Sequence, residues 1–103
     1  MSVMILSGIV QGNGEIASGT GFTVKNIKND KNDKNDILDI GVWIGFDQSF
    51  ETVPSVTATL CAWTEQEATE VMYIRYATPS KDSAWIHFLA QSSNWKICFI
   101  AAG

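Results

Sequence analysis

The chain contains few of the side chains that ligate metals, carry acid–base chemistry or interrupt strands. Of its 103 residues, one is histidine, two are cysteine, two are proline, and only 17% are charged. Seven basic and eleven acidic residues give a net charge of −4, and the basic residues form no cluster. We therefore expect no nucleic-acid partner, because such binding needs a concentrated positive surface. The apolar runs are only as long as strands, so we expect no membrane insertion.

Cysteines and leader signals are also sparse. Cys61 and Cys98 each lie in an apolar stretch, and they are interpreted either as two buried thiols or as a disulfide between adjacent strands. The single His87 cannot complete a metal site with them, so no metal or cofactor is predicted. The N-terminal MSVMILSG has no charged segment and few apolar residues, which predicts no secretory signal. Cytoplasmic synthesis with export by another route, or association with a particle, stays open.

What the chain does have is regular alternation of apolar and polar residues, most clearly between residues 40 and 62. Two segments alternate there, and a polar turn that ends at Pro54 joins them. Proline is tolerated at the start of a strand but not inside a paired one, so the pattern predicts two antiparallel strands. The residues expected on one face of each strand are Ile40, Val42, Ile44 and Phe46, then Val56, Ala58, Leu60 and Ala62.

The same alternation recurs along the rest of the chain, and no segment of useful length has helical periodicity. Further strands are predicted at residues 3–10, 22–25, 69–78, 84–90 and 95–102. Strict alternation puts Arg75 and Tyr76 on opposite faces, and Trp85 on the same face as His87. Six or seven short strands separated by turns are typical of an antiparallel all-β sandwich or barrel. Residues 1–103 are expected to form one domain.

Residues 28–36 are three copies of Lys-Asn-Asp, a low-complexity insert without any apolar residue. This composition predicts a solvated loop between two strands. A calcium loop is the alternative, since Asp30, Asp33, Asp36 and Asp39 offer oxygen ligands. The period of three differs from the spacing of an EF-hand, and each repeat carries a lysine that repels a cation. The solvated loop is therefore the preferred interpretation.

Groups suited to catalysis do not occur together. His87 lies in the middle of an apolar strand without an identifiable nucleophile beside it, so a core or interface histidine is favoured over a general base. Glu65 and Glu67 are two residues apart in a polar connection, which fixes no separation suited to acid–base catalysis. We predict that the protein is not an enzyme.

Tryptophan is the residue type in excess, with four among 103 residues, and so small a sandwich cannot bury all of them. Trp43 and Trp63 both fall on the strand face opposite the apolar row. Amphipathic rings in such places suit either stacking against a sugar or burial against another subunit. Other pairs, such as Phe99 and Ile100, also put large apolar residues on both faces of one strand, which predicts self-association, expected as a homotrimer or hexamer.

Several motifs together resemble the H-type lectin domain of snail agglutinins and discoidins, and related small bacterial and phage modules that end fibre proteins. These motifs are Leu6-Ser7-Gly8, Ser18-Gly19-Thr20-Gly21-Phe22-Thr23-Val24, Phe46-x3-Phe50-x3-Pro54-x-Val56 and Phe99-Ile100-Ala101-Ala102-Gly103. The resemblance covers most of the chain. It implies a six-stranded antiparallel sandwich that trimerises and binds galactose or N-acetylgalactosamine.

The same resemblance suggests where a sugar would bind. We expect a site between subunits that uses Asp33 or Asp36, Arg75, and an aromatic ring from Trp63 or Trp95. A carboxylate accepts protons from sugar hydroxyls, arginine donates, and a flat ring covers the apolar face of a pyranose. A structural ion pair is the alternative role for Arg75. Two function classes follow: a multivalent carbohydrate-binding module, and a trimerisation or capping module that binds no small ligand.

Overall fold

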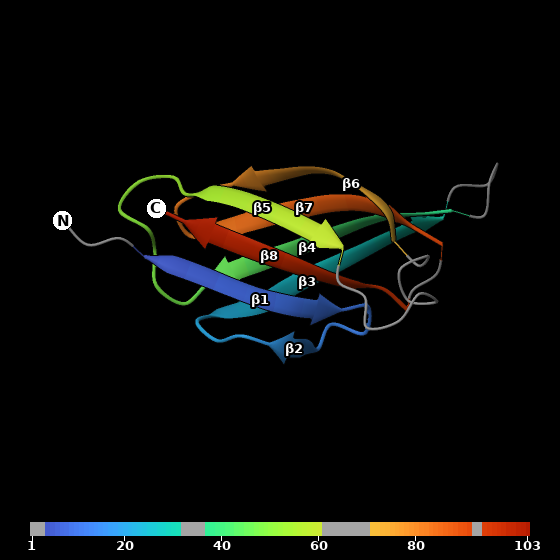
Figure 1. Ribbon diagram of the computed structural model, residues 1–103, viewed down its shortest axis with the longest axis horizontal. Helices are drawn as coiled ribbons and strands as arrows, with labels where there is room; N and C mark the ends of the chain where they lie inside the picture. Colours follow the sequence, from blue (N-terminus) through green and yellow to red (C-terminus); the bar gives the residue numbers. More distant parts are fainter. Residues whose placement is uncertain (1–3, 32–36, 61–70, 92–93) are drawn as a thin grey trace.

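The computed structural model describes residues 4–31, 37–60, 71–91 and 94–103, and these residues form a β-sandwich (Figure 1). The strands are β1 (Ile5–Gln11), β2 (Ile16–Ser18), β3 (Phe22–Lys31), β4 (Leu38–Phe46), β5 (Ser55–Leu60), β6 (Val71–Pro79), β7 (Ser83–Ala90) and β8 (Lys96–Ala102). Among the described residues, no helix is long and apolar enough to cross a membrane.

The strands form two antiparallel four-stranded sheets. The front sheet of Figure 1 has the order β2-β1-β8-β5, and the back sheet has the order β3-β4-β7-β6. The predicted all-β antiparallel class is therefore confirmed, whereas the predicted number of six to seven strands is wrong because the described residues alone form eight. The strand that the prediction missed is β2, whose three residues are all exposed. A strand this short and without a buried face leaves no alternation in the sequence.

The alternation predicted from the sequence determines what lies between the sheets. Ile40, Val42 and Ile44 of β4 are completely buried, and Trp43 between them is exposed. In the same way, β8 buries Ile97 and β7 buries Phe88. One core shared by both sheets results, and its other buried members are Val10, Phe22, Phe46, Phe50, Ala84, Ile86, Ala90, Trp95, Phe99 and Ala101.

The Lys-Asn-Asp repeat begins inside a strand, which corrects the prediction that the loop starts at Lys28. β3 continues to Lys31, which pairs with Leu38 of β4. Because β3 is an edge strand, its polar side chains remain in water, so the backbone pairs without an apolar sequence pattern. The rest of the repeat, residues 32–36, lies outside the described residues.

Strict alternation also fails in β6. The register of β6 against β7 shifts between Ile74 and Tyr76, as it does where a β-bulge inserts one extra residue. Ile74 and Ala77 therefore both pack against the core, while Arg75 and Tyr76 are both exposed. The prediction that Arg75 and Tyr76 occupy opposite faces is wrong for this reason.

Candidate functional site: the outer face of the back sheet

Four ring side chains form a continuous row across the outer face of the back sheet. Trp43 of β4 lies directly opposite Trp85 of β7, and the two rings stack with centroids 5.6 Å apart and planes 15° apart. Trp85 in turn contacts His87 on the same strand at 5.6 Å. His87 stacks on Tyr76 of β6 at 4.3 Å. We call these four residues the aromatic row.

The two ends of the aromatic row are open to solvent. Trp43 is 38% exposed and Tyr76 is 51% exposed, while Trp85 and His87 between them are half-buried. Cross-strand ring pairs of this kind stabilise a sheet modestly, by ~0.5–1.5 kcal/mol beyond their buried area. Large rings that stay partly exposed in addition to this contribution can also contact a ligand, so the row is a candidate binding surface.

Two glycines of β4 shape the surface around Trp43. The outward residues of β4 are Asp39, Gly41, Trp43 and Gly45, so the tryptophan has a residue without a side chain on either side. At Gly41 the ring of Trp85 occupies the space, and a Cβ there would lie 3.0 Å from its Cζ3 atom. At Gly45 the side chain of Lys25 lies across the glycine instead.

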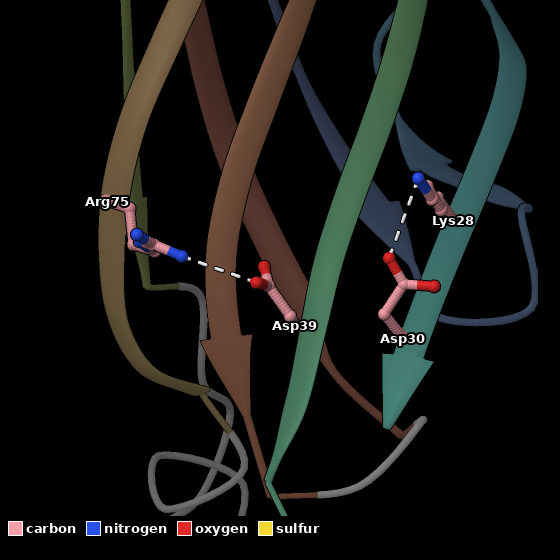
Figure 2. A network of polar contacts seen from close by, with 4 residues as sticks. All are labelled: Lys28, Asp30, Asp39 and Arg75. Atoms are coloured by element: carbon pink, nitrogen blue, oxygen red, sulfur yellow. Dashed lines mark hydrogen bonds and ion pairs between the residues drawn. The ribbon is translucent and has the colours of Figure 1, made fainter. Parts of the chain in front are cut away.

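Two ion pairs border the aromatic row (Figure 2). Arg75 of β6 reaches over β7, and its Nη1 donates a hydrogen bond of 3.3 Å to Oδ2 of Asp39 on β4. On the neighbouring edge strand, Lys28 Nζ lies 3.6 Å from Asp30 Oδ2. All four side chains are about half exposed or more, so their polar atoms remain accessible to a ligand.

Bulges in both edge strands of the back sheet place cations on this face. The register of β3 shifts between Val24 and Asn26, which makes Lys25 the extra residue. The corresponding shift in β6 makes Arg75 the extra residue. A bulge re-aims a side chain, and bulges are frequent beside functional sites. The two cations therefore reach the outer face from opposite edges of the sheet.

Two hollows lie on this face, one at each glycine. The Gly41 hollow has a volume of about 320 Å³ and is lined by Lys28, Asp30, Asp39, Gly41, Trp85 and His87. The Gly45 hollow has a volume of about 370 Å³ and is lined by Lys25, Trp43, Gly45, Asp82 and Ser83. Each hollow combines a ring, a lysine and at least one carboxylate, which are the groups that bind a polar ligand with an apolar face.

The predicted sugar-binding residues are only partly brought to this face. Arg75 lies on it, engaged in the ion pair with Asp39 that the sequence left open as an alternative. Trp95 does not, because it is 1% exposed and packs edge-on against Phe88 in the core. Its ring therefore cannot stack against a sugar, and this part of the prediction is corrected. Asp33, Asp36 and Trp63 lie outside the described residues.

None of the four members of the aromatic row was among the predicted site residues, although Trp43 was noted as an outward ring. The other three are Tyr76, Trp85 and His87. Their signal was present in part, since Trp85 and His87 alternate with Ile86 and Phe88 and so share the outward face of β7. His87 is accordingly no core residue. The position of Tyr76 opposite His87 depends on the bulge at Arg75, which alternation alone cannot predict.

Metal ligation was also considered. Among residues 4–31, 37–60, 71–91 and 94–103, no group of three or more His, Cys, Asp or Glu side chains could hold a metal ion. Of the four carboxylates considered for calcium, Asp30 and Asp39 each have a cation beside them. Asp33 and Asp36, the other two carboxylates of the calcium hypothesis, lie outside the described residues, as does Cys61, the cysteine that would pair with the half-buried Cys98.

Compared with protein-family models, with curated proteins and with solved structures, the chain matches none. What the outer face of the back sheet can bind therefore follows from its own residues and geometry.

Proposed function

We propose that the protein is a carbohydrate-binding, lectin-like module that binds a glycan on the aromatic row. The observation that carries this proposal is the stacked pair of Trp43 and Trp85, which stands on a solvent-exposed sheet face between two hollows that each contain a lysine and a carboxylate. A pyranose has an apolar face that suits a flat ring, and a rim of hydroxyl groups that need partners. This face supplies both kinds of contact within one surface.

The polar groups around the row suit sugar hydroxyls better than they suit an ionic ligand. Asp30 and Asp39 present carboxylate oxygens as acceptors, and Lys28 and Arg75 present donors. Because each carboxylate already has a cation beside it at 3.3 to 3.6 Å, the ion pairs favour these positions of the polar side chains, by a modest amount, before a ligand arrives. Side chains ordered in advance lose less conformational entropy on binding.

The motif resemblance to H-type lectins supports the same function and suggests the first sugars to test, galactose and N-acetylgalactosamine. It also supports a homotrimer, or a hexamer built from two trimers. Several weak sites on one oligomer gain avidity by factors of roughly 10² to 10⁴ when their spacing matches that of a clustered ligand. A multivalent particle of this kind would bind glycan-coated surfaces far more tightly than free sugar.

The direct test is a glycan array with a soluble sugar competitor, comparing the protein with its Trp43→Ala variant. We expect the variant to lose at least about tenfold in affinity, equivalent to ~1.4 kcal/mol. Val53→Ala is the matched control, because Val53 is 56% exposed but lies outside both sheets. Unchanged glycan binding by a folded Trp43→Ala variant would contradict the proposal, as would a protein that binds no glycan.

A structural module without a small ligand is the second candidate, and the front sheet favours it. The outward residues of β5, β8 and β1 are uncharged except for Lys96 at one end. The uncharged ones are Ser55, Thr57, Thr59, Cys98, Ile100, Ala102, Ile5, Ser7, Ile9 and Gln11. A stable oligomer without any glycan affinity would favour this function over the first.

A further inference from the structure

The Gly41 hollow and the Gly45 hollow are two separate places on one surface. Their two glycines are four residues apart on β4, which corresponds to roughly 13 Å along a strand. The stacked rings of Trp43 and Trp85 stand between them, with Trp85 lining one hollow and Trp43 lining the other. A single pyranose ring is too short to occupy both hollows, whereas a short chain of sugars can.

The two hollows are chemically similar but not equal. The Gly41 hollow contains two carboxylates, Asp30 and Asp39, and both Trp85 and His87 contribute to its wall. The Gly45 hollow contains one carboxylate, Asp82, and part of its floor is covered by the Lys25 side chain, whose Cε would clash with a Cβ at residue 45. The Gly41 hollow therefore offers more fixed contacts to one sugar residue.

The charges of the face favour an uncharged chain. Asp30, Asp39 and Asp82 oppose Lys25, Lys28 and Arg75, so the cations and carboxylates around the aromatic row balance in number. The whole chain carries a net charge of −4. An acidic glycan would gain no net attraction from a balanced site and would be repelled by the rest of the molecule.

We infer that the aromatic row binds a neutral oligosaccharide of two or more residues, with a primary subsite in the Gly41 hollow and a secondary subsite in the Gly45 hollow. This inference rests on the proposed function and adds to it the length and charge of the ligand. The stacked Trp43–Trp85 pair lies under the linkage between the subsites, and the two hollows beside the pair hold the sugars.

The test measures affinity against chain length by titration calorimetry. The probes are β-1,4-linked galactose and N-acetylhexosamine oligomers of one to four units, together with a sulfated form of each trisaccharide. We expect affinity to rise at least tenfold from one to three units and then to level off. The sulfated trisaccharides are expected to bind no more tightly than the neutral ones.

The Gly45→Val variant should separate the two subsites. Gly45 does not have a positive φ. The three atoms nearest to a new Cβ are Cε, Cγ and Cδ of the flexible Lys25 side chain, so valine is compatible with the strand once that side chain moves aside. We expect trisaccharide affinity to fall to within about threefold of the monosaccharide, while monosaccharide affinity stays unchanged. Thr57→Val on the front sheet is the matched control, and it should bind as the parent protein does.

The outcomes distinguish this inference from the function on which it rests. If no oligomer of either series binds, the proposed function fails and the inference fails with it. If one and three units bind equally, or if Gly45→Val weakens both equally, the subsites are wrong while glycan binding stands. Should Gly45→Val not fold, Lys25→Ala replaces it, and it should weaken trisaccharide binding at least threefold without affecting the monosaccharide.

Discussion

The two outer faces of this sandwich differ in chemistry although both cover the same core. The back sheet carries rings, cations and carboxylates, with hollows between them. The front sheet has only Lys96 as a charged group among the outward residues of β1, β5 and β8, and its exposed large aliphatic residues are Ile5, Ile16 and Ile100. A surface with rings, charges and hollows, such as that of the back sheet, suits a small polar ligand. A surface with few charges and exposed aliphatic residues, such as that of the front sheet, suits another protein surface.

The comparison teaches that strand periodicity and surface function are separate pieces of information. Alternation with a period of two gives both sheets the same pattern of buried residues. It therefore does not indicate which of the two outer faces binds a ligand. That difference comes from residue type at the outward positions, with glycine beside tryptophan on β4 and threonine beside serine on β5. Substitutions on the two faces should accordingly have different effects.

The largest expected effect on folding comes from the inward side of β7, where Ile86 is completely buried. Ile86→Ala should lower the free energy of unfolding by ~2–5 kcal/mol through lost burial and a cavity. His87→Ala, one residue away on the outward side, should cost less than ~1.5 kcal/mol, because only its ring contacts with Tyr76 and Trp85 are lost. Chemical denaturation measures both, and equal losses would contradict the assignment of faces.

The next effect concerns the front sheet and self-association. Ile100 is 51% exposed at the middle of that face, and a lysine there would have to be buried without a partner in any oligomer formed through it. Ile100→Lys should weaken association at least tenfold, ~1.4 kcal/mol, in sedimentation equilibrium. Tyr76→Lys on the back sheet is the control and should leave the oligomer intact. A parent protein that is monomeric at micromolar concentration would exclude the homotrimer.

A smaller effect is expected from the ion pair between Arg75 and Asp39. Both side chains are 45% exposed, and exposed pairs typically contribute ~0.2–1 kcal/mol. A double-mutant cycle with Arg75→Ala and Asp39→Ala measures this coupling free energy in unfolding experiments. The same variants should weaken glycan binding more than they weaken folding. Glycan binding that persists in both single variants would remove these two residues from the site.

The smallest effect is expected from shortening the Lys-Asn-Asp repeat. Because its period is three, deleting any one triplet gives the same chain, so β3 keeps a lysine at position 31 in every case. Loop-closure entropy changes slowly with length, and stability should change by well under about 1 kcal/mol. A fall in melting temperature of many degrees would show that the repeat packs against the domain or binds an ion.

The burial of residues could be predicted best in strands that lie between two other strands of a sheet. In β4, β7 and β8 the alternation assigned the inward residues correctly, because each of these strands lies between two others and the extra residues of the bulges lie in the edge strands β3 and β6. The same rule placed Trp95 in the row of Ile97, Phe99 and Ala101, all of which are buried. Its burial could therefore have been predicted, and the proposal of a sugar contact for it depended on ring chemistry rather than on pattern.

The candidate site could be predicted only in part, because it depends on bulges. The residue types around Lys25 and Arg75 do not predict an extra residue in either strand. The bulges nevertheless determine which face of the sheet each cation reaches. The aromatic row has a similar origin, since Tyr76 meets His87 only after the register shift in β6. The site therefore depends on the register of strands that are far apart in the chain. A single sequence does not specify that register.

The bulged edge strands have a further consequence for how copies of the chain can meet. An open sheet edge is a template for strand addition, which leads to aggregation. In the back sheet, β3 and β6 interrupt that template with bulges and charged side chains, and in the front sheet β2 is only three residues long. The remaining edge strand, β5, lies beside β6 of the other sheet. With strand addition disfavoured along these edges, chains can associate through their faces without polymerising into fibres.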